Sequence, residues 1–194
     1  MKESLLKNIG DKGVALTTGE KELLSSFFKH RSFRKNQYLL QAGDVARYET
    51  FIIRGLTRTV IADEAGQEHV ISFNAEDGWT GDLYSYFMQV PTSYTIDCLE
   101  ATDVLQIGLK DLEQLFTTIP SMNSYFRMLY RNSLISYHQR VASTLCKPAA
   151  ERYREFLLKY PEIKMRVPDH QIASFLGITP QSLSRIRRQV SQKK

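Results

Sequence analysis

The sequence predicts an α+β protein made of an N-terminal antiparallel β-roll of the jelly-roll type, a long central helix and a C-terminal helix-turn-helix domain. Three observations support this fold class. Short segments rich in β-branched and aromatic residues alternate with glycines over 33–108, a helical period of apolar residues covers 122–145, and a capped helix pair with a glycine turn covers 167–188. We expect the domains to be 1–120, 121–146 and 147–194.

Residues 1 to about 30 are expected to be helical, because apolar clusters in 5–9 and 20–28 follow a helical spacing. The composition then changes to Val, Ile, Thr, Tyr and Phe, and glycines at 43, 55, 66 and 78 divide the chain into short pieces. Short strands at this spacing are typical of β-sandwiches and barrels. The expected strands are 38–40, 51–53, 56–61, 69–73, 93–99 and 104–107, with a hairpin connection at 63–66.

After residue 108 the apolar period becomes helical again. We expect a short helix over 110–116, a long helix over 122–145 and a further helix over 149–160. The long helix spans about 36 Å at 1.5 Å per residue. Leu129 and Ile135 extend its apolar surface beyond one stripe, so we expect it to contact both the β domain and a second copy of the chain. A helix packed wholly within one subunit is the alternative.

Residues 167–188 have the pattern of two short helices joined by a tight turn. Pro168 and Asp169 favour a helix start, and Thr179 followed by Pro180 repeats this signal for the second helix. Gly177 between them accepts the left-handed conformation that a tight turn requires. The apolar positions of the two helices are Ile172, Ala173, Leu176, Leu183, Ile186 and Val190.

This pattern indicates a DNA-binding helix-turn-helix. The small residue Ala173 permits a close crossing of the helices, and the second helix then enters the major groove with its N-terminal side chains toward the bases. An αα-hairpin that only packs is the alternative. The candidate DNA-contacting residues are Thr179, Gln181, Ser182, Arg185, Arg187 and Arg188, with Lys193 as a candidate phosphate contact.

The positive charge of the chain is concentrated in this C-terminal segment. Residues 147–194 contain 11 Lys and Arg against 4 Asp and Glu, a net charge of +7, whereas residues 1–146 contain 15 and 17, a net charge of −2. A basic module beside a nearly neutral one suits attraction to a phosphate backbone. No stretch approaches the roughly 18 apolar residues of a membrane span, and the start lacks a signal-peptide core, so we expect a cytoplasmic protein without a membrane partner.

The order of a β-roll, a long helix and a helix-turn-helix resembles the cyclic-AMP receptor and fumarate–nitrate regulator (Crp/Fnr) family of bacterial transcription factors. The resemblance covers about 33–190, and its motifs are QAGD at 41–44, FIIRG at 51–55, WTGDL at 79–83 and the helix pair. It implies a cyclic-nucleotide-binding-like sensor domain, a homodimer formed through the long helix, binding to two-fold symmetric double-stranded DNA, and contact with RNA polymerase. It also implies base contacts by Gln181, Ser182 and Arg185.

The sequence departs from the family pattern at the cyclic-nucleotide pocket, which uses a Gly-Glu pair and an Arg on the cyclic phosphate. Here Gly81 is followed by Asp82, one methylene shorter, and the position of the Arg falls at Thr92. A buried phosphate without a cation forfeits a charge-assisted hydrogen bond, so cyclic AMP is not the expected effector. The candidate pocket residues for an unknown small-molecule effector are Gly81, Asp82, Leu83, Thr92 and Ser93.

No metal or cofactor is expected. Cys98 and Cys146 match no metal or redox spacing, and no cysteine cluster precedes them, as the iron–sulfur branch of the family requires. His69 is the one histidine of 33–108, and we expect it on the surface of a strand rather than on a haem.

Two other classes of function compete with a transcription regulator. A cupin-like enzyme needs about three converging His or carboxylate ligands, and the single histidine is too few, so we expect no enzyme. A ligand-binding β-roll whose helix pair makes a protein contact is the second alternative. The aromatic side chains at 84, 86, 87 and 94 either line a pocket for an aromatic ligand or, as we favour, fill the core.

Overall fold

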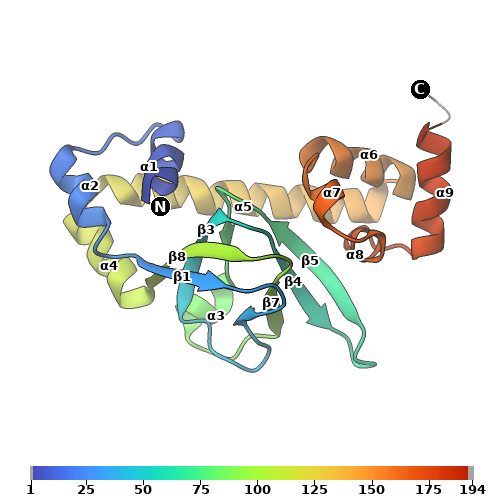
Figure 1. Ribbon diagram of the computed structural model, residues 1–194, viewed down its shortest axis with the longest axis horizontal. Coiled ribbons are helices and arrows are strands. Elements are labelled where there is room, and N and C mark those ends of the chain that lie inside the picture. The colour runs from blue at the N-terminus through green and yellow to red at the C-terminus, as the bar shows by residue number, and fades with distance from the viewer. Residues whose placement is uncertain (1, 192–194) are drawn as a thin grey trace. The chain divides into compact units, whose positions relative to one another are not determined.

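The computed structural model describes residues 2–191 and has the predicted α+β fold, in which a β-roll precedes a long helix and a group of short C-terminal helices (Figure 1). The candidate phosphate contact Lys193 lies outside the described residues. The helices are α1 (Lys2–Asp11), α2 (Thr18–Leu24), α3 (Leu83–Met88), α4 (Leu109–Thr118), α5 (Ser121–Cys146), α6 (Ala149–Lys159), α7 (Ile163–Arg166), α8 (Asp169–Phe175) and α9 (Pro180–Ser191).

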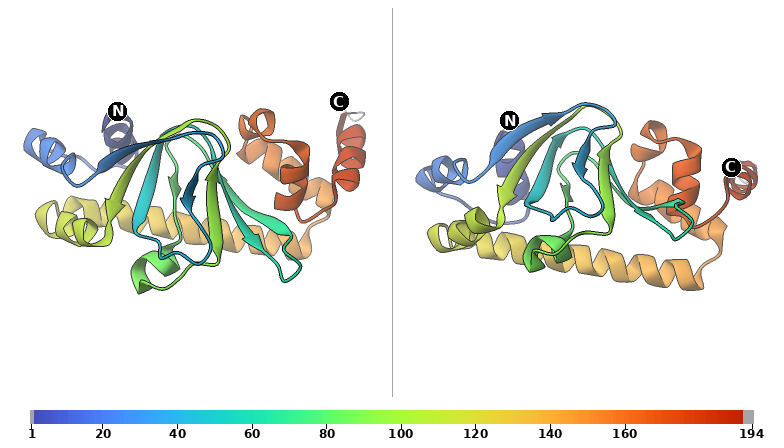
Figure 2. Two further views of the ribbon diagram at one scale, coloured as in Figure 1. Left: turned by 60° about the horizontal axis from the view of Figure 1, so that its bottom comes forward. Right: turned by 90° about the horizontal axis from the view of Figure 1, so that it is seen from below.

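Two four-stranded sheets form the β-roll within the described chain, with the strand orders β1-β8-β3-β6 and β2-β7-β4-β5 (Figures 1 and 2). The strands are β1 (Lys29–Phe33), β2 (Tyr38–Leu40), β3 (Tyr48–Arg54), β4 (Thr57–Ala62), β5 (Glu68–Asn74), β6 (Trp79–Thr80), β7 (Tyr94–Cys98) and β8 (Thr102–Gly108). In the first sheet β8 pairs antiparallel with β1 on one edge and with β3 on the other. The expected strands and the hairpin at 63–66 are therefore confirmed.

A cluster of aromatic rings around Trp79 forms the centre of the β-roll core. The Trp79 ring centroid lies 5.5 Å from that of Phe51 and 5.3 Å from that of Phe126. Its Nε1 donates a 2.9 Å hydrogen bond to the Tyr125 hydroxyl, which in turn donates a 2.8 Å bond to Oδ1 of Asn8. These two hydrogen bonds join α1, β6 and α5, so elements far apart in the sequence share one core.

The N-terminal region differs from the helical expectation after residue 24. The hydroxyls of Ser25 and Ser26 donate 2.7 Å hydrogen bonds to the carbonyls of Glu22 and Leu23 at the end of α2. Residues 29–33 then form β1, which pairs along its whole length with β8. The conformation of β1 depends on this distant partner, which a local sequence pattern does not reveal.

The long helix is confirmed as α5, and its two halves differ in burial. Met122, Tyr125 and Phe126 in the first half are buried in the core. Apolar side chains in the second half are exposed, with Leu134 59% exposed and Val141 58% exposed. The second half of α5 therefore presents an apolar surface without cover from the described part of its own chain.

The described residues form two compact units. The first comprises the chain up to residue 59 together with 73–132, and the second comprises 60–72 together with the chain from 133 onward. The second unit thus contains the tip of the β4–β5 hairpin, the second half of α5 and the short C-terminal helices. The domain limits expected from the sequence stay a prediction.

Arg140 on α5 holds the second unit together. Its guanidinium donates hydrogen bonds to the carbonyls of Ile71, of Val70 at 3.3 Å and of Phe175 at 3.4 Å, and it lies 4.3 Å from the centroid of the Phe175 ring. The backbone N–H of Val70 donates a 3.0 Å bond to Oγ of Ser174. Burial of the guanidinium lowers the pKa of Arg140. The hairpin, the long helix and α8 are therefore joined through one cation and its carbonyl partners.

We expect Arg140→Met to lower the free energy of unfolding by about 2–4 kcal/mol, because three hydrogen bonds from a charged donor and its contact with the Phe175 ring are lost. Hydrogen exchange should also lose protection at the Val70 amide. Arg154→Met, which removes an exposed arginine of the same unit, is the matched control and should change the stability little. Equal effects of the two substitutions would contradict the role given to Arg140.

Candidate DNA interface and effector pocket

The two helices of the candidate DNA interface are α8 and α9, and their apolar faces are buried as the sequence predicts. Ile172 and Ala173 on α8 have no exposed surface, and Leu183 on α9 is 1% exposed. Leu176 and Ile186 complete this small core. A side chain larger than that of Ala173 would have to separate the helices, so the small residue sets how closely they pack.

The turn between α8 and α9 is a Schellman motif. Gly177 has φ +64°, its N–H donates to the Ser174 carbonyl at 2.9 Å, and the Ile178 N–H donates to the Ala173 carbonyl at 3.0 Å. Arg152 donates a 2.9 Å bond to the Leu176 carbonyl at the same helix end. The orphan carbonyls of α8 are thus satisfied, which fixes the direction in which the chain enters α9.

The first turn of α9 is capped by Thr179. Its Oγ1 accepts a 3.2 Å hydrogen bond from the Ser182 backbone N–H and contacts the Ser182 hydroxyl at 3.0 Å. Thr179 is exposed, whereas Ser182 is half-buried. Both predicted residues lie at the N-terminal end of α9, where their hydroxyls already serve the cap.

One side of α9 presents the remaining polar residues to solvent. Gln181, Arg185 and Arg188 follow one another at steps of four and three and are exposed. Ser184 lies on the same side and is also exposed. Ser184 is not among the DNA contacts predicted from the sequence, although its position three residues after Gln181 indicates the same side of the helix.

Arg187 differs from the other predicted DNA contacts, because its guanidinium is engaged within the second unit. Its Nε donates a 3.0 Å hydrogen bond to the Tyr153 hydroxyl, and it forms an ion pair with Asp169. Arg187 lies four positions after the buried Leu183, beside the apolar stripe rather than opposite to it. Its contacts position α9 on α6 and α8, which argues against a base contact by this residue.

The candidate effector residues around α3 are bonded to one another. Asp82 caps α3, with Oδ1 accepting the N–H groups of Tyr84 at 3.0 Å and Ser85 at 3.3 Å. Its Oδ2 accepts a 2.6 Å hydrogen bond from the Thr92 hydroxyl. Asp82 and Thr92 are buried. The structure therefore brings these two predicted residues together, but both carboxylate oxygens are already used by the chain.

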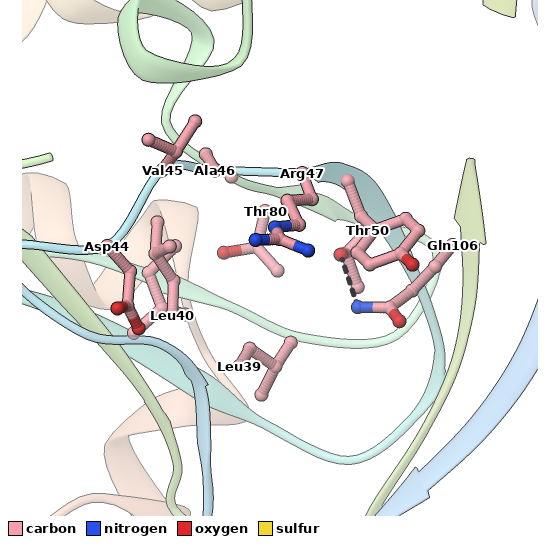
Figure 3. Close-up of a pocket in the computed structure, with 12 residues that line it drawn as sticks. Leu39, Leu40, Asp44, Val45, Ala46, Arg47, Thr50, Thr80 and Gln106 are labelled. Carbon is pink, nitrogen blue, oxygen red and sulfur yellow. Dashed lines mark hydrogen bonds between the residues drawn. The ribbon is translucent and has the colours of Figure 1, made fainter. Parts of the chain in front are cut away.

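The other predicted pocket residues are dispersed around this pair. Leu83 is 36% exposed and Ser93 is exposed. Gly81 contributes to the wall of a cavity of about 290 Å³ inside the β-roll (Figure 3). The lining residues are Leu39, Leu40, Asp44, Val45, Ala46, Arg47, Tyr48, Thr50, Thr80, Gly81, Ile96 and Gln106.

Most polar residues of this cavity were not among the sequence candidates. Thr50 and Gln106 are buried, and the Gln106 side-chain amide donates a 3.3 Å hydrogen bond to the Thr50 hydroxyl. They come from paired positions on β3 and β8. Successive side chains of β3 point to opposite faces of the sheet, so Thr50 and its neighbours in the strand face different sides. The pairing of β3 with β8, which brings Thr50 beside Gln106, has no local sequence signal.

The aromatic residues of the same region divide between core and surface. Tyr86 is fully buried, and its hydroxyl donates a 3.3 Å hydrogen bond to the Ile107 carbonyl. Tyr84 is 68% exposed and Phe87 is 43% exposed. The favoured assignment to the core therefore holds for Tyr86 and is wrong for Tyr84 and Phe87, while Tyr94 is half-buried.

A buried carboxyl lies next to Gly81. Glu49 is 3% exposed, and its Oε1 has no hydrogen-bond partner among the described residues. Burial, together with the negative charge of Asp82, raises the pKa of Glu49 to about 8. A Cβ at Gly81 would lie 3.3 Å from that Oε1. The absence of a side chain at Gly81 thus leaves room for the Glu49 carboxyl, which is protonated near neutral pH.

The described residues contain no group of three or more His, Cys, Asp or Glu side chains arranged to hold a metal ion. None of the helices in 2–191 combines the length and the apolar character needed to cross a bilayer.

Cys98 is buried and Cys146 is exposed, and both are free thiols. His69 is paired with Asp63 at 2.7 Å beside the hairpin turn.

Residues 30–118 match the cyclic nucleotide-binding domain family. The transcriptional regulatory protein Btr of Bordetella pertussis is 22% identical over 187 residues, covering 89% of this chain and 76% of that protein. The anaerobic regulatory protein of Pasteurella multocida is 23% identical over 189 residues, covering 89% and 68%. Both relatives are regulatory proteins. This confirms the expectation from the sequence of a regulator rather than an enzyme.

The fold is also similar to that of solved structures. FixK2 from Bradyrhizobium japonicum superposes with a TM-score of 0.75 at 16% sequence identity, covering 86% of this chain and 85% of FixK2. At this identity the similarity establishes the fold.

Glu49 should make the stability of the protein decrease between about pH 5 and pH 8. The folded state holds the proton up to a pKa of about 8, whereas the unfolded chain releases it near the ordinary value of 4.5, so the unfolded state binds fewer protons in this interval. Glu49→Gln should flatten this dependence, measured as urea midpoints across the interval. Glu22→Gln, at an exposed position, is the control, and an unchanged slope in Glu49→Gln would contradict the assignment.

Proposed function

We propose that this chain, a cyclic nucleotide-binding domain protein that resembles the Crp/Fnr family of transcription regulators, is a homodimeric regulator that binds double-stranded DNA through α9. The observation that carries the proposal is the exposed row of Gln181, Arg185 and Arg188 on a helix whose opposite side is fixed by packing. A helix-turn-helix needs this combination of a rigid support and free polar side chains.

Base reading is assigned to the N-terminal half of α9. Gln181 and Arg185 lie four positions apart and point to the same side. An arginine there can donate two hydrogen bonds to O6 and N7 of guanine, and a glutamine can pair with adenine. Ser182, in the first turn, is proposed as a further base contact, and Thr179 at the helix start is proposed as a phosphate contact. The net charge of +7 over residues 147–194 supplies the sequence-independent attraction.

The second half of α5 is assigned to the dimer interface. Leu134, Tyr137, Val141 and Leu145 recur at steps of three and four and are each at least half exposed. A stripe with this spacing suits a paired helix related by two-fold symmetry. Two recognition helices in such a dimer would read half-sites about 34 Å apart, so the operator should be an inverted repeat.

RNA polymerase is the protein partner that we expect for a regulator that binds DNA in this way.

A small molecule remains the expected effector. The segment that binds the cyclic phosphate in the resembling family carries Asp82 hydrogen-bonded to Thr92 here. A cyclic phosphate bound in this segment would lie near the negative charge of Asp82, and the segment offers no cation to pair with it. We therefore propose an effector other than cyclic AMP.

Arg185→Ala should cost about 1–3 kcal/mol per half-site and relax the preference at one base position, because a bidentate guanine contact is lost. The preferred sequence is first selected from random duplex DNA, and affinities are then measured by fluorescence anisotropy at several salt concentrations. Arg154→Ala removes the same charge from an exposed position on α6, and it should leave the base preference unchanged.

Unchanged affinity and preference in Arg185→Ala would contradict base reading by α9. Absence of salt-dependent DNA binding by the parent protein would favour the alternative in which the helix pair makes a protein contact.

Combined replacement of Leu134 and Tyr137 by Glu should produce monomers and abolish operator binding, because four negative charges would meet in the apolar interface of the dimer. Sedimentation equilibrium measures the oligomeric state. Gln139→Glu adds a charge to the same helix outside the stripe and should leave the dimer intact. A monomeric parent protein at micromolar concentration would refute the dimer.

A further inference from the structure

We infer that Glu49 is a proton-operated switch in the β-roll: its buried carboxyl holds α3 in place on α5 while it carries a proton, and it releases α3 when the proton leaves. The inference rests on the proposed function, because it adds a proton to the signals of a DNA-binding dimer. It depends on the burial of the carboxyl, on the groups gathered around it, and on the contacts through which α3 responds.

The Glu49 side chain lies on the face of β3 opposite to the cavity. Its neighbours Tyr48 and Thr50 line the cavity, and successive side chains of a strand point to opposite faces. Glu49 is 3% exposed, and its Oε1 lies beside Gly81 without a hydrogen-bond partner among residues 2–191. Burial without a partner disfavours the ionised carboxylate, so the carboxyl keeps this position only with its proton.

The groups around this carboxyl offer no positive charge. Burial, and after it the charge of Glu49, raises the pKa of the hydroxyls of Tyr86 on α3 and Tyr130 on α5. The Tyr130 hydroxyl is itself buried without a hydrogen-bond partner in the described chain. From α4, Asp111 and Glu113 act on Tyr86. Within 2–191 the groups that act on this cluster are therefore carboxylates and hydroxyls, and no cation offsets a charge on Glu49.

Asp82 supplies the force that acts on α3. Its carboxylate caps this helix by accepting the N–H groups of Tyr84 and Ser85, and it also accepts the Thr92 hydroxyl. After burial, the negative charge of Asp82 is the second cause that raises the pKa of Glu49 to about 8. When Glu49 ionises, two negative charges face each other at the start of α3, and displacement of α3 separates them and admits water.

Few contacts oppose this displacement. Tyr84 and Met88 on α3 are 68% and 62% exposed, whereas Tyr86 is fully buried. The Phe87 ring meets the Tyr130 ring edge to face, with the centroids 5.9 Å apart. A short segment with so little buried apolar surface opens more readily than the core. Because Tyr130 belongs to α5, the helix assigned to the dimer interface, the release of α3 removes support from that helix.

The dependence on pH follows from the pKa of the carboxyl in the two forms. With α3 in place, Glu49 keeps its proton up to a pKa of about 8, and in the released form water returns the carboxyl toward its ordinary pKa of 4.5. The released form therefore binds fewer protons between these values. Its ratio to the closed form should rise about tenfold per pH unit in this interval and level off above it.

Trp79 reports the change, because it is the single tryptophan of the chain and lies two residues before Gly81. Its fluorescence is recorded on the full chain from pH 5 to pH 9, with circular dichroism to show that the chain stays folded. We expect a sigmoidal change with a midpoint below about pH 8 in the parent protein. Glu49→Gln, which has the same shape but no proton to lose, should stay in the closed form. Glu22→Gln, at an exposed position, is the matched control and should keep the transition.

A Trp79 transition in Glu49→Gln equal to that of the parent protein would overturn the switch, and so would a parent protein without a transition. A second measurement needs no variant. The side-chain carboxyl carbon of Glu49, followed by NMR, should have the chemical shift of a protonated acid at pH 6, and the shift of an ionised carboxylate at that pH would also overturn the inference.

Operator affinity at pH 6 and pH 8 separates the switch from the proposed function. Between these two values the parent protein should lose at least tenfold more affinity than Glu49→Gln, because only the parent protein releases α3. Absence of DNA binding by both proteins at both pH values, with the Glu49-dependent Trp79 transition intact, would refute the DNA-binding regulator and leave the switch. Equal losses of affinity in the two proteins would overturn the regulatory role of Glu49.

Discussion

The second unit depends on the hydrogen bonds that a half-buried guanidinium donates to carbonyl oxygens of the chain. Arg140 donates to carbonyls of the β4–β5 hairpin and to the carbonyl at the end of α8, and it stacks on Phe175. Carbonyl oxygens carry partial charges, so the cation needs several of them at once, and only a closed arrangement of hairpin, α5 and α8 supplies them. The same cation therefore contacts β5 and the end of α8, two elements of the second unit.

A similar constraint governs the segment that follows β6. A short helix needs acceptors for its first N–H groups, and at α3 Asp82 supplies them while it also accepts the Thr92 hydroxyl. Both oxygens of the Asp82 carboxylate therefore accept hydrogen bonds from the chain itself, so a ligand would have to displace them. Its charge also helps to keep the neighbouring Glu49 protonated. Both effects reduce the affinity of this segment for an anion.

The sequence was most informative where the signal is local. Caps, the turn glycine and helical periods predicted α5, α8 and α9 closely, because propensity and packing agree there. The sequence was least informative where a distant partner decides. β1 is a strand because β8 pairs with it, and Gln106 lines a cavity because β3 brings Thr50 beside it. No window of the sequence contains both partners, so neither feature had a recognisable pattern.

Arginine illustrates why residue type alone did not assign the sites. Arg187 and Arg185 are two positions apart on α9, yet Asp169 and Tyr153 engage the first while the second is exposed. Arg187 gains less from an external ligand, because its contacts with Asp169 and Tyr153 must first be broken. Of these two arginines, the exposed Arg185 is therefore the one that can bind an external anion such as a phosphate backbone.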